Sequence, residues 1–319
     1  MAAFSLTDVD MYWAGLDLAC YSNQAQVAVS SSDVDVTTFC SGGWSETISG
    51  LRTVTISSSG PTDMTAASAT LTSTAASWSS PYATVTATGH GLTPGRTVTF
   101  SGFTPSAWNG TYRVLDTPTA NTFRVEINAD PGVVTVQGKV KAYAGLDEVI
   151  SAGGVGVTGP WSAIPAGTVE GSVGYFTDAM LMGFTPLTGS ISDVAKYEAS
   201  WSGRQKLVRG TLTSAQVVSA TGSGTGFQLG TVTASQSMYA ALHVVSAAGT
   251  TPSITVKVQS DDNSGFSSPT DQITFTAATV YGGQILSAAG SITDDWWRAV
   301  WTVSGTTPGF AVRTVLGIA

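Results

Sequence analysis

The sequence contains little charge. Asp, Glu, Lys and Arg make up 11% of its 319 residues, where about 25% is usual in soluble domains. Acids outnumber bases, and the formal net charge is −8. Proteins that bind nucleic acid concentrate Lys and Arg against the phosphates, so this balance argues against a nucleic-acid binder. Gly, Ser, Thr and Ala fill the positions that charge would otherwise take.

Cysteine is scarce as well. Cys20 and Cys40 are the only two, too few for a disulfide framework in a chain of this length, and we expect both to be reduced thiols. No run of about 18 apolar residues could span a membrane. The first ten residues lack the basic start and apolar core of a signal peptide. We therefore expect no membrane partner.

The residues that enzymes need are also few. His90 and His243 are the only histidines, no G-x-S-x-G motif marks a nucleophilic serine, and His and Cys do not occur at zinc-ligand spacing. Residues 154–159 (GVGVTG) match the dinucleotide motif G-x-G-x-x-G, but Pro160 and Pro165 follow where that motif needs a helix to open. We expect a glycine-rich loop there, and no enzyme, cofactor or metal site.

Two acidic clusters could have a function. Residues 261–265 (DDNSG) contain calcium-ligand types, but they lack the EF-hand spacing and its closing Glu, so they predict a turn between strands. Asp294 and Asp295 could serve as paired glycosidase carboxylates only if they faced each other, and neighbouring residues of a strand point to opposite faces. Trp296, which follows them, is a candidate for stacking on a sugar, with core packing as the alternative.

The sequence is rich in β-strand patterns. Thr, Val and Ser recur in short alternating runs, and nine Trp, eleven Phe and nine Tyr supply core material. The stretch Asp33–Gly60 predicts a polar strand, a loop at Cys40–Trp44 that is too rich in glycine for a helix, and a second strand at Val54–Ser57. We predict an all-β, mainly antiparallel fold.

The excess of acid is confined to two segments. Residues 1–60 hold six acids and one base, and residues 141–205 hold six acids and three bases, whereas the remaining two segments are balanced. An acidic domain interrupted by a neutral insert explains this pattern, and chance drift of charge along the chain is the alternative. We predict three domains: residues 1–60 with 141–210, residues 61–140, and residues 211–319.

The neutral insert has its own signature. Residues 62–80 are of low complexity and predict a linker. Five short runs then predict the strands of a small barrel; they lie at 82–88, 96–100, 111–115, 123–127 and 133–136. The stretch 83–127, with its motifs G-H-G-L and W-N-G-T-Y, resembles a small barrel module of phage structural proteins that is similar to the first catalytic-cysteine half-domain of ubiquitin-activating enzymes. The insert has no cysteine, so no ubiquitin chemistry is implied.

After the insert, one helix is expected. Val173, Phe176 and Phe184 recur near a 3.6-residue spacing, which predicts a short helix over 171–184 that packs on a sheet. Residues 195–202 alternate and predict a half-buried strand. The rest of the chain predicts a two-sheet β-sandwich, with strands at 237–245, 253–259, 272–276, 296–303 and 310–318.

Two separated stretches resemble one family. The first is the strand, loop and T-V-T-I-S strand of residues 33–60, and the second runs from G-x-V-x-Y-F at Gly171 to K-L-V-R-G at Lys206–Gly210. Both are similar to the major tail (tail tube) proteins of long, non-contractile phage tails. The resemblance implies a tail-tube β-sandwich with one helix, stacked in rings into a hollow tube that conducts DNA without specific binding. The rings of that family are hexameric, or trimeric where a chain carries two tube-like domains. The resemblance also implies other tail proteins as partners, and a place in the virion tail after assembly in the host cytoplasm.

An acidic wall would repel the DNA phosphates that pass it. We therefore expect carboxylates of the acidic domain at the lumen or the adjoining ring interfaces, namely Asp33, Asp35, Asp147, Glu148 and Glu170. Exposed strand edges and the loop at residues 151–165 are expected to join the subunits. The neutral C-terminal sandwich is expected to be an outward decoration, or else a second tube domain. A carbohydrate-binding adhesin or capsid decoration protein is the alternative function.

Overall fold

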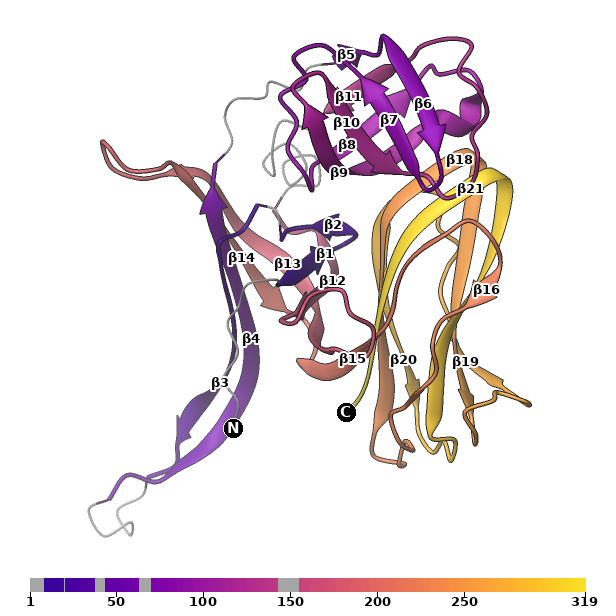
Figure 1. The fold of residues 1–319 in the computed structure, drawn as a ribbon. Coiled ribbons are helices and arrows are strands. Elements are labelled where there is room, and N and C mark those ends of the chain that lie inside the picture. The colour runs from indigo at the N-terminus through magenta and orange to yellow at the C-terminus, as the bar shows by residue number, and fades with distance from the viewer. Residues whose placement is uncertain (1–8, 20, 38–43, 63–69, 143–154) are drawn as a thin grey trace.

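The computed structural model describes residues 9–19, 21–37, 44–62, 70–142 and 155–319 (Figure 1). Within these residues every regular element is a β-strand, apart from one 3₁₀ turn at Ser106–Trp108. The strand pairs are antiparallel, so the prediction of an all-β, mainly antiparallel fold is confirmed. None of the described residues forms a helix long and apolar enough to cross a membrane.

The first part of the fold is a sheet assembled from distant parts of the chain. In order across the sheet, its strands are β2 (Leu16–Asp17), β1 (Asp10–Trp13), β12 (Thr158–Ile164), β13 (Val173–Thr188), β14 (Lys196–Gly203), β4 (Thr47–Pro61) and β3 (Gln24–Asp35). Trp13, Trp161 and Trp201 lie in its core. The two strands predicted in the stretch 33–60 are present as β3 and β4, although β4 is longer than expected, and residues 38–43 of the predicted loop lie outside the described part.

The predicted helix at 171–184 is wrong, because residues 173–184 belong to strand β13. Phe176 packs on one face of the strand and Leu181 on the other, in two different apolar clusters. A strand that is buried on both faces has an almost continuous apolar run, within which a 3.6-residue spacing can be found by chance. Three glycines in the segment also disfavour a helix.

The insert wraps seven strands around one core. In spatial order these are β6 (Ala75–Ser79), β7 (Tyr82–Thr86), β10 (Thr122–Glu126), β9 (Gly110–Thr119), β8 (Thr97–Ser101), β11 (Lys139–Ala142) and β5 (Thr70–Thr72). Phe100, Trp108 and Phe123 fill the core. Four of the five predicted strands are present, but residues 133–136 make only an isolated bridge from Val136 to Thr104.

Two segments predicted as loops contain strands. The expected linker at 62–80 includes β5 and β6, because Leu71 and Trp78 pack against the core of the insert. Residues 63–69 lie outside the described part. The expected glycine-rich loop at 151–165 includes β12, which begins at Thr158 and runs through Pro160. The composition of these segments therefore predicted loops, although the alternation of their apolar residues is sufficient for strands.

The C-terminal part is built on two long strands, β18 (Ser237–Asp261) and β21 (Trp296–Ile318), which pair along their whole length. Both bend near Gly249 and Gly305, whose positive φ angles are 111° and 116°. A Cβ at Gly249 would lie 2.6 Å from the Thr307 carbonyl oxygen, so the corner needs glycine. β19 (Thr270–Thr274) and β20 (Gly282–Ala289) pair with the two halves of β18. The folded ribbon encloses a core around Trp297 and Phe310.

Strand β15 (Val208–Val218) joins the first sheet to this sandwich, because it pairs with both β13 and β21. The short strands β16 (Gly222–Ser223) and β17 (Phe227–Gln228) follow it and also pair with β21. The insert contacts the bend of β18, where Gly110 pairs with Ala248. The predicted domain bounds after residues 60, 140 and 210 fall inside β4, β11 and β15, and the division into three domains stays a prediction.

Candidate self-assembly surface

The hairpin of β3 and β4 projects beyond the sheet to which it belongs (Figure 1). β14 pairs with β4 only from Pro61 to Val54, whereas β3 and β4 stay paired as far as Asp35 and Thr47. We call residues 30–37 and 44–53 the distal hairpin. Its side chains are exposed on both faces, so nothing in the described part of the chain covers it.

One face of the distal hairpin is apolar. Val34 and Ile48 are cross-strand partners, with exposed fractions of 44% and 55%. Leu51 lies at the bulge between the pairs Ser31–Arg52 and Asp33–Ser49 and is 84% exposed. An exposed strand pair with apolar side chains is a ready surface for association.

The other face carries two of the predicted carboxylates. Asp33 and Asp35 pair with Ser49 and Thr47 and are both exposed. The Asp35 carboxylate accepts a hydrogen bond of 2.8 Å from the Thr37 backbone N–H, and hydrogen bonds from Thr37 hold the pKa of Asp35 below its ordinary value. Asp35 therefore stabilises the end of the hairpin, and the Asp33 carboxylate points to solvent without a partner in the described part.

The other predicted acids are not gathered with these two. Asp147 and Glu148 lie outside the described residues. Glu170 lies between β12 and β13, where its carboxylate accepts hydrogen bonds from the Ala215 backbone N–H (3.1 Å), the Gln216 side chain (2.9 Å) and the Thr225 hydroxyl (2.9 Å). Its contacts therefore fasten this loop to β15 and to the chain that follows β15.

The outer edge of β3 has no partner strand among the described residues. Beside it lies a cleft of about 620 Å³, lined by Ala25 and Val27 on the β3 side and by Met11 and Tyr175 on the opposite side. Clefts of this size can hold a ligand or a segment of chain. That exposed strand edges join the subunits stays a prediction, and the outer edge of β3 is one such edge.

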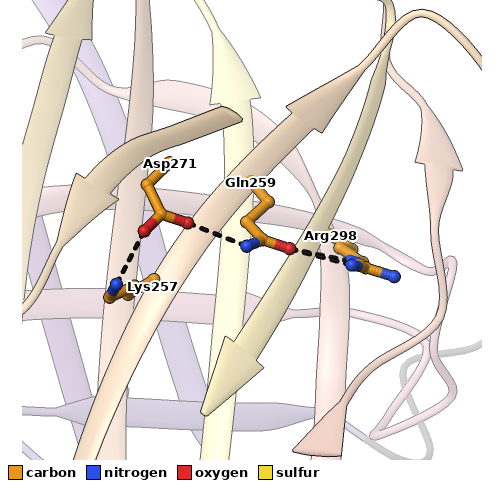
Figure 2. A network of polar contacts seen from close by, with 4 residues as sticks. All are labelled: Lys257, Gln259, Asp271 and Arg298. Carbon is orange, nitrogen blue, oxygen red and sulfur yellow. Dashed lines mark hydrogen bonds and ion pairs between the residues drawn. The ribbon is translucent and has the colours of Figure 1, made fainter. Parts of the chain in front are cut away.

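A second surface lies on the sandwich, where a polar network joins three strands (Figure 2). Asp271 accepts hydrogen bonds from Lys257 Nζ (2.6 Å) and Gln259 Nε2 (2.8 Å), and Gln259 Oε1 accepts one from Arg298 (2.9 Å). The contacts from Lys257 and Gln259 hold the pKa of Asp271 below its ordinary value. Trp296 lies on the same face of β21 as Arg298 and is half-buried, whereas Trp297 is in the core.

The acidic clusters have structural partners. Asp261 accepts hydrogen bonds from the backbone N–H groups of Asn263 (3.1 Å) and Ser268 (2.9 Å), which forms the predicted turn. Asp294 accepts a hydrogen bond of 2.6 Å from Ser260, and Asp295 accepts one of 2.6 Å from Gln228. The two neighbouring carboxylates are thus bound to different strands.

A buried Ser–His pair was not predicted. Ser162 Oγ lies 2.8 Å from His243 Nε2, and both residues are fully buried. His243 Nδ1 accepts a hydrogen bond from the Gly15 backbone N–H (3.4 Å), so Nε2 carries the proton and its N–H donates a hydrogen bond to Ser162 Oγ. Burial lowers the pKa of His243 to about 3. This histidine is therefore neutral and is a hydrogen-bond donor to the serine, the opposite of the general base of a triad.

A buried ion pair at the junction of the three parts was also missed. Asp17 of β2 and Arg113 of β9 approach to 2.8 Å, with side-chain exposures of 3% and 37%. Arg313 of β21 donates a hydrogen bond of 3.2 Å to the Tyr12 hydroxyl. The sequence does hold a signal for such buried groups, since Asp17 and His243 are both flanked by apolar residues (GLDLA and ALHVV).

Comparisons with known proteins identify no family. No protein-family profile matches the chain, and no curated protein matches it. Among solved structures, the Dit protein (gp 19.1) of phage SPP1 aligns with 98% of this chain and 99% of its own. That structure is described as a paradigm of the hub adsorption apparatus in phages that infect Gram-positive bacteria. The identity is 9% and the TM-score 0.29, too low to show a shared fold, so we transfer nothing from that protein to this chain.

Proposed function

We propose that this chain is a structural protein of a phage tail, specifically the subunit of the tail tube, which assembles into stacked rings in the host cytoplasm and resides in the virion. The distal hairpin carries the proposal, because its two faces are uncovered while the sheet behind it is well packed. The resemblance of residues 33–60 and 171–210 to tail tube proteins supports the same function. The proposal includes no enzymatic activity, cofactor or metal.

Identical copies explain the uncovered hairpin. A surface that binds a different surface of the next copy generates closed rings or open helical filaments. The apolar side chains Val34, Ile48 and Leu51 would then be removed from water only in the assembly, at about 25 cal/mol per Å² of apolar area buried. Hexameric rings, or trimeric rings if the sandwich acts as a second tube domain, would enclose the channel. Its acidic excess would let DNA pass without specific binding.

Electron microscopy and analytical ultracentrifugation of the purified protein test this proposal. We expect rings or tubes from the wild type, and only monomers from an Ile48→Ser, Leu51→Ser variant. Val280→Ser is a matched control, since Val280 is an exposed apolar residue (65%) elsewhere on the chain, and its assembly should be unchanged. A wild-type protein that stays monomeric at high concentration would overturn the proposal, and so would normal assembly of the double variant.

A carbohydrate-binding adhesin or decoration protein is the second candidate. It is favoured by Trp296, which is half-buried on the face that also carries the network of Lys257, Gln259, Asp271 and Arg298 (Figure 2). Aromatic rings flanked by amide and charged groups can stack on sugars and bond their hydroxyls. Glycan-array binding by the wild type that is lost in Trp296→Ala, with no rings in the microscope, would select this function instead.

A further inference from the structure

We infer that the acidic end of the hairpin of one copy docks on a basic turn of the next copy. The acidic end comprises Asp33, Asp35 and Glu46, and the basic turn comprises Arg204, Lys206 and Arg209. This inference rests on the proposed self-assembly and adds to it the receiving surface. The occupant of the basic turn is thus a second copy of this chain.

The basic turn is the densest group of positive charge in the chain. Three of the 13 Lys and Arg residues fall within the six residues 204–209, and all three are exposed. No other six-residue window holds as many. The Asp178 carboxylate offsets the charge of Arg204, so Lys206 and Arg209 supply the net positive charge of this surface.

The turn is held rigidly in place. The backbone N–H of Arg204 donates to the Asp178 carbonyl oxygen (2.7 Å), and its guanidinium pairs with the Asp178 carboxylate (3.0 Å). The Thr177 hydroxyl donates to the Gln205 carbonyl oxygen (3.1 Å). Lys206 Nζ lies 4.9 Å from the ring centroid of Tyr239. A preformed charged surface loses less entropy on binding than a mobile one.

The acidic end offers the complementary charge. Asp33, Asp35 and Glu46 are exposed, and Arg52 is the only base in the distal hairpin. None of the ion pairs within the described residues joins the acidic end to the basic turn. Complementary surfaces that do not pair with each other within one copy can pair between copies.

The geometry separates the two surfaces within one copy. β14 ends at Gly203 opposite Val54 of β4. The basic turn then leads away from β4 into β15, whose residue Val208 pairs with Phe176 of β13. The hairpin instead continues past Val54 to the pair Asp33–Ser49, about 15 Å further on at 3.4 Å per residue. The two segments diverge in Figure 1. The contact is therefore head-to-tail between copies, and repeating it builds rings or filaments.

Charge reversal tests the inference. The hairpin variant carries Asp33→Lys and Glu46→Lys, and keeps Asp35 because Asp35 bonds Thr37. The turn variant carries Lys206→Glu and Arg209→Glu, and keeps Arg204 because Arg204 bonds Asp178. Each variant alone places like charges in contact, and we expect the protein concentration needed for assembly to rise about tenfold or more.

Mixing the two variants is the decisive step. The reversed hairpin of one then meets the reversed turn of the other, and the two native surfaces also meet, so an equimolar mixture should assemble at the wild-type concentration, with the two variants alternating. Lys139→Glu, a reversal of an exposed charge on the insert, is the matched control and should have no effect. Circular dichroism confirms that each variant is folded.

The outcomes separate this inference from the proposed function. Assembly of either variant at the wild-type concentration would overturn the inference, and so would a mixture of folded variants that does not assemble, while rings of the wild type would still support a tube subunit. A wild type that forms no rings would overturn the proposed function itself.

Discussion

Replacing Arg113 with Ala should lower the free energy of unfolding more than replacing its partner Asp17 with Asn. The Asp17 side chain is 3% exposed, whereas that of Arg113 is 37% exposed. Without Arg113, the Asp17 carboxylate stays buried with the Ala19 backbone N–H (3.0 Å) as its remaining hydrogen-bond donor. Without the Asp17 charge, water can still solvate the Arg113 guanidinium. The two halves of one ion pair therefore have unequal effects.

The expected magnitudes follow from this asymmetry. Breaking a fully buried ion pair costs about 3–5 kcal/mol. Arg113 is more than a third exposed and is screened by water, so we expect about 2 kcal/mol for Arg113→Ala and about 1 kcal/mol or less for Asp17→Asn at pH 7. Asp17→Asn also removes the cost of burying a charge, which further reduces its effect.

The stability lost in Arg113→Ala also depends on pH. Burial raises the pKa of Asp17 above its ordinary value, although Arg113 opposes this shift. The folded state then binds the proton more tightly than the unfolded state, so the contribution of Asp17 to stability is full at low pH and is lost as the pH rises through the raised pKa. Removing Arg113 raises that pKa further. The loss in Arg113→Ala should therefore be largest at pH 7 and should shrink toward pH 4.

Urea unfolding followed by tryptophan fluorescence measures these differences, with the midpoints of wild type, both single variants and the double variant compared at pH 7 and pH 4.5. The reasoning is refuted if Asp17→Asn costs as much as Arg113→Ala at pH 7. It is also refuted if the loss in Arg113→Ala is the same at both pH values.

Four further outcomes are expected. Gly110→Ala should loosen the insert from the sandwich, because the new Cβ would lie 2.6 Å from Ala248 Cα, and hydrogen exchange at 109–111 and 247–249 should rise several-fold. Gly282→Ala, where a Cβ has open space and the backbone φ is not positive, should leave these segments unchanged. His90→Ala should cost about 2–3 kcal/mol in urea unfolding, because His90 accepts from the Leu92 N–H (3.0 Å) and bonds the Thr119 carbonyl oxygen (3.1 Å); a change below 0.5 kcal/mol would contradict this. The pKa of His243 is lowered to about 3, so the folded state binds a proton less tightly than the unfolded state does. The contribution of His243 to the free energy of unfolding is therefore full above about pH 6.5 and falls by at most about 5 kcal/mol as the pH drops toward 3. In acid titrations, His243→Gln should flatten this dependence of stability on pH. Finally, the mixed charge-reversal variants must alternate around a ring, so closed rings in the microscope should contain an even number of copies, and a trimeric ring from the mixture would contradict alternation.

Most strands could be predicted from the sequence because their alternation is local. The runs at 237–245 and 253–259 are correct as strands, but no pattern shows that they are halves of one strand, since the glycine between them resembles a turn. Gly249 instead bends β18 while its pairing with β21 continues. The error at 171–184 has a related cause. Burial on both faces removes the alternation by which a strand is recognised.

The candidate surface could be predicted only in part. Asp33 and Asp35 were identified by their charge, but the exposure of Ile48 and Leu51 depends on where β14 ends, some 150 residues later in the chain. Alternation predicts two faces of a strand and cannot show that neither face is covered. The basic turn is visible as three bases in six residues, yet its meaning depends on the separation of the hairpin from β13, which is a tertiary property.

The contact between Arg313 and Tyr12, which are 301 residues apart, has a consequence for the order of events on the ribosome. The apolar cluster around Tyr12 also includes Val315, so it cannot form until Val315 has been translated. At about 5–20 residues per second, the interval between the two ends is about 15–60 s. The hairpin is synthesised early and the last strand of its sheet, β14, ends at Gly203, but the cluster that packs Tyr12 and Phe176 of this sheet against Val315 forms later. Both proposed docking surfaces, the distal hairpin and the basic turn, are therefore translated while the sheet behind them is still only partly packed.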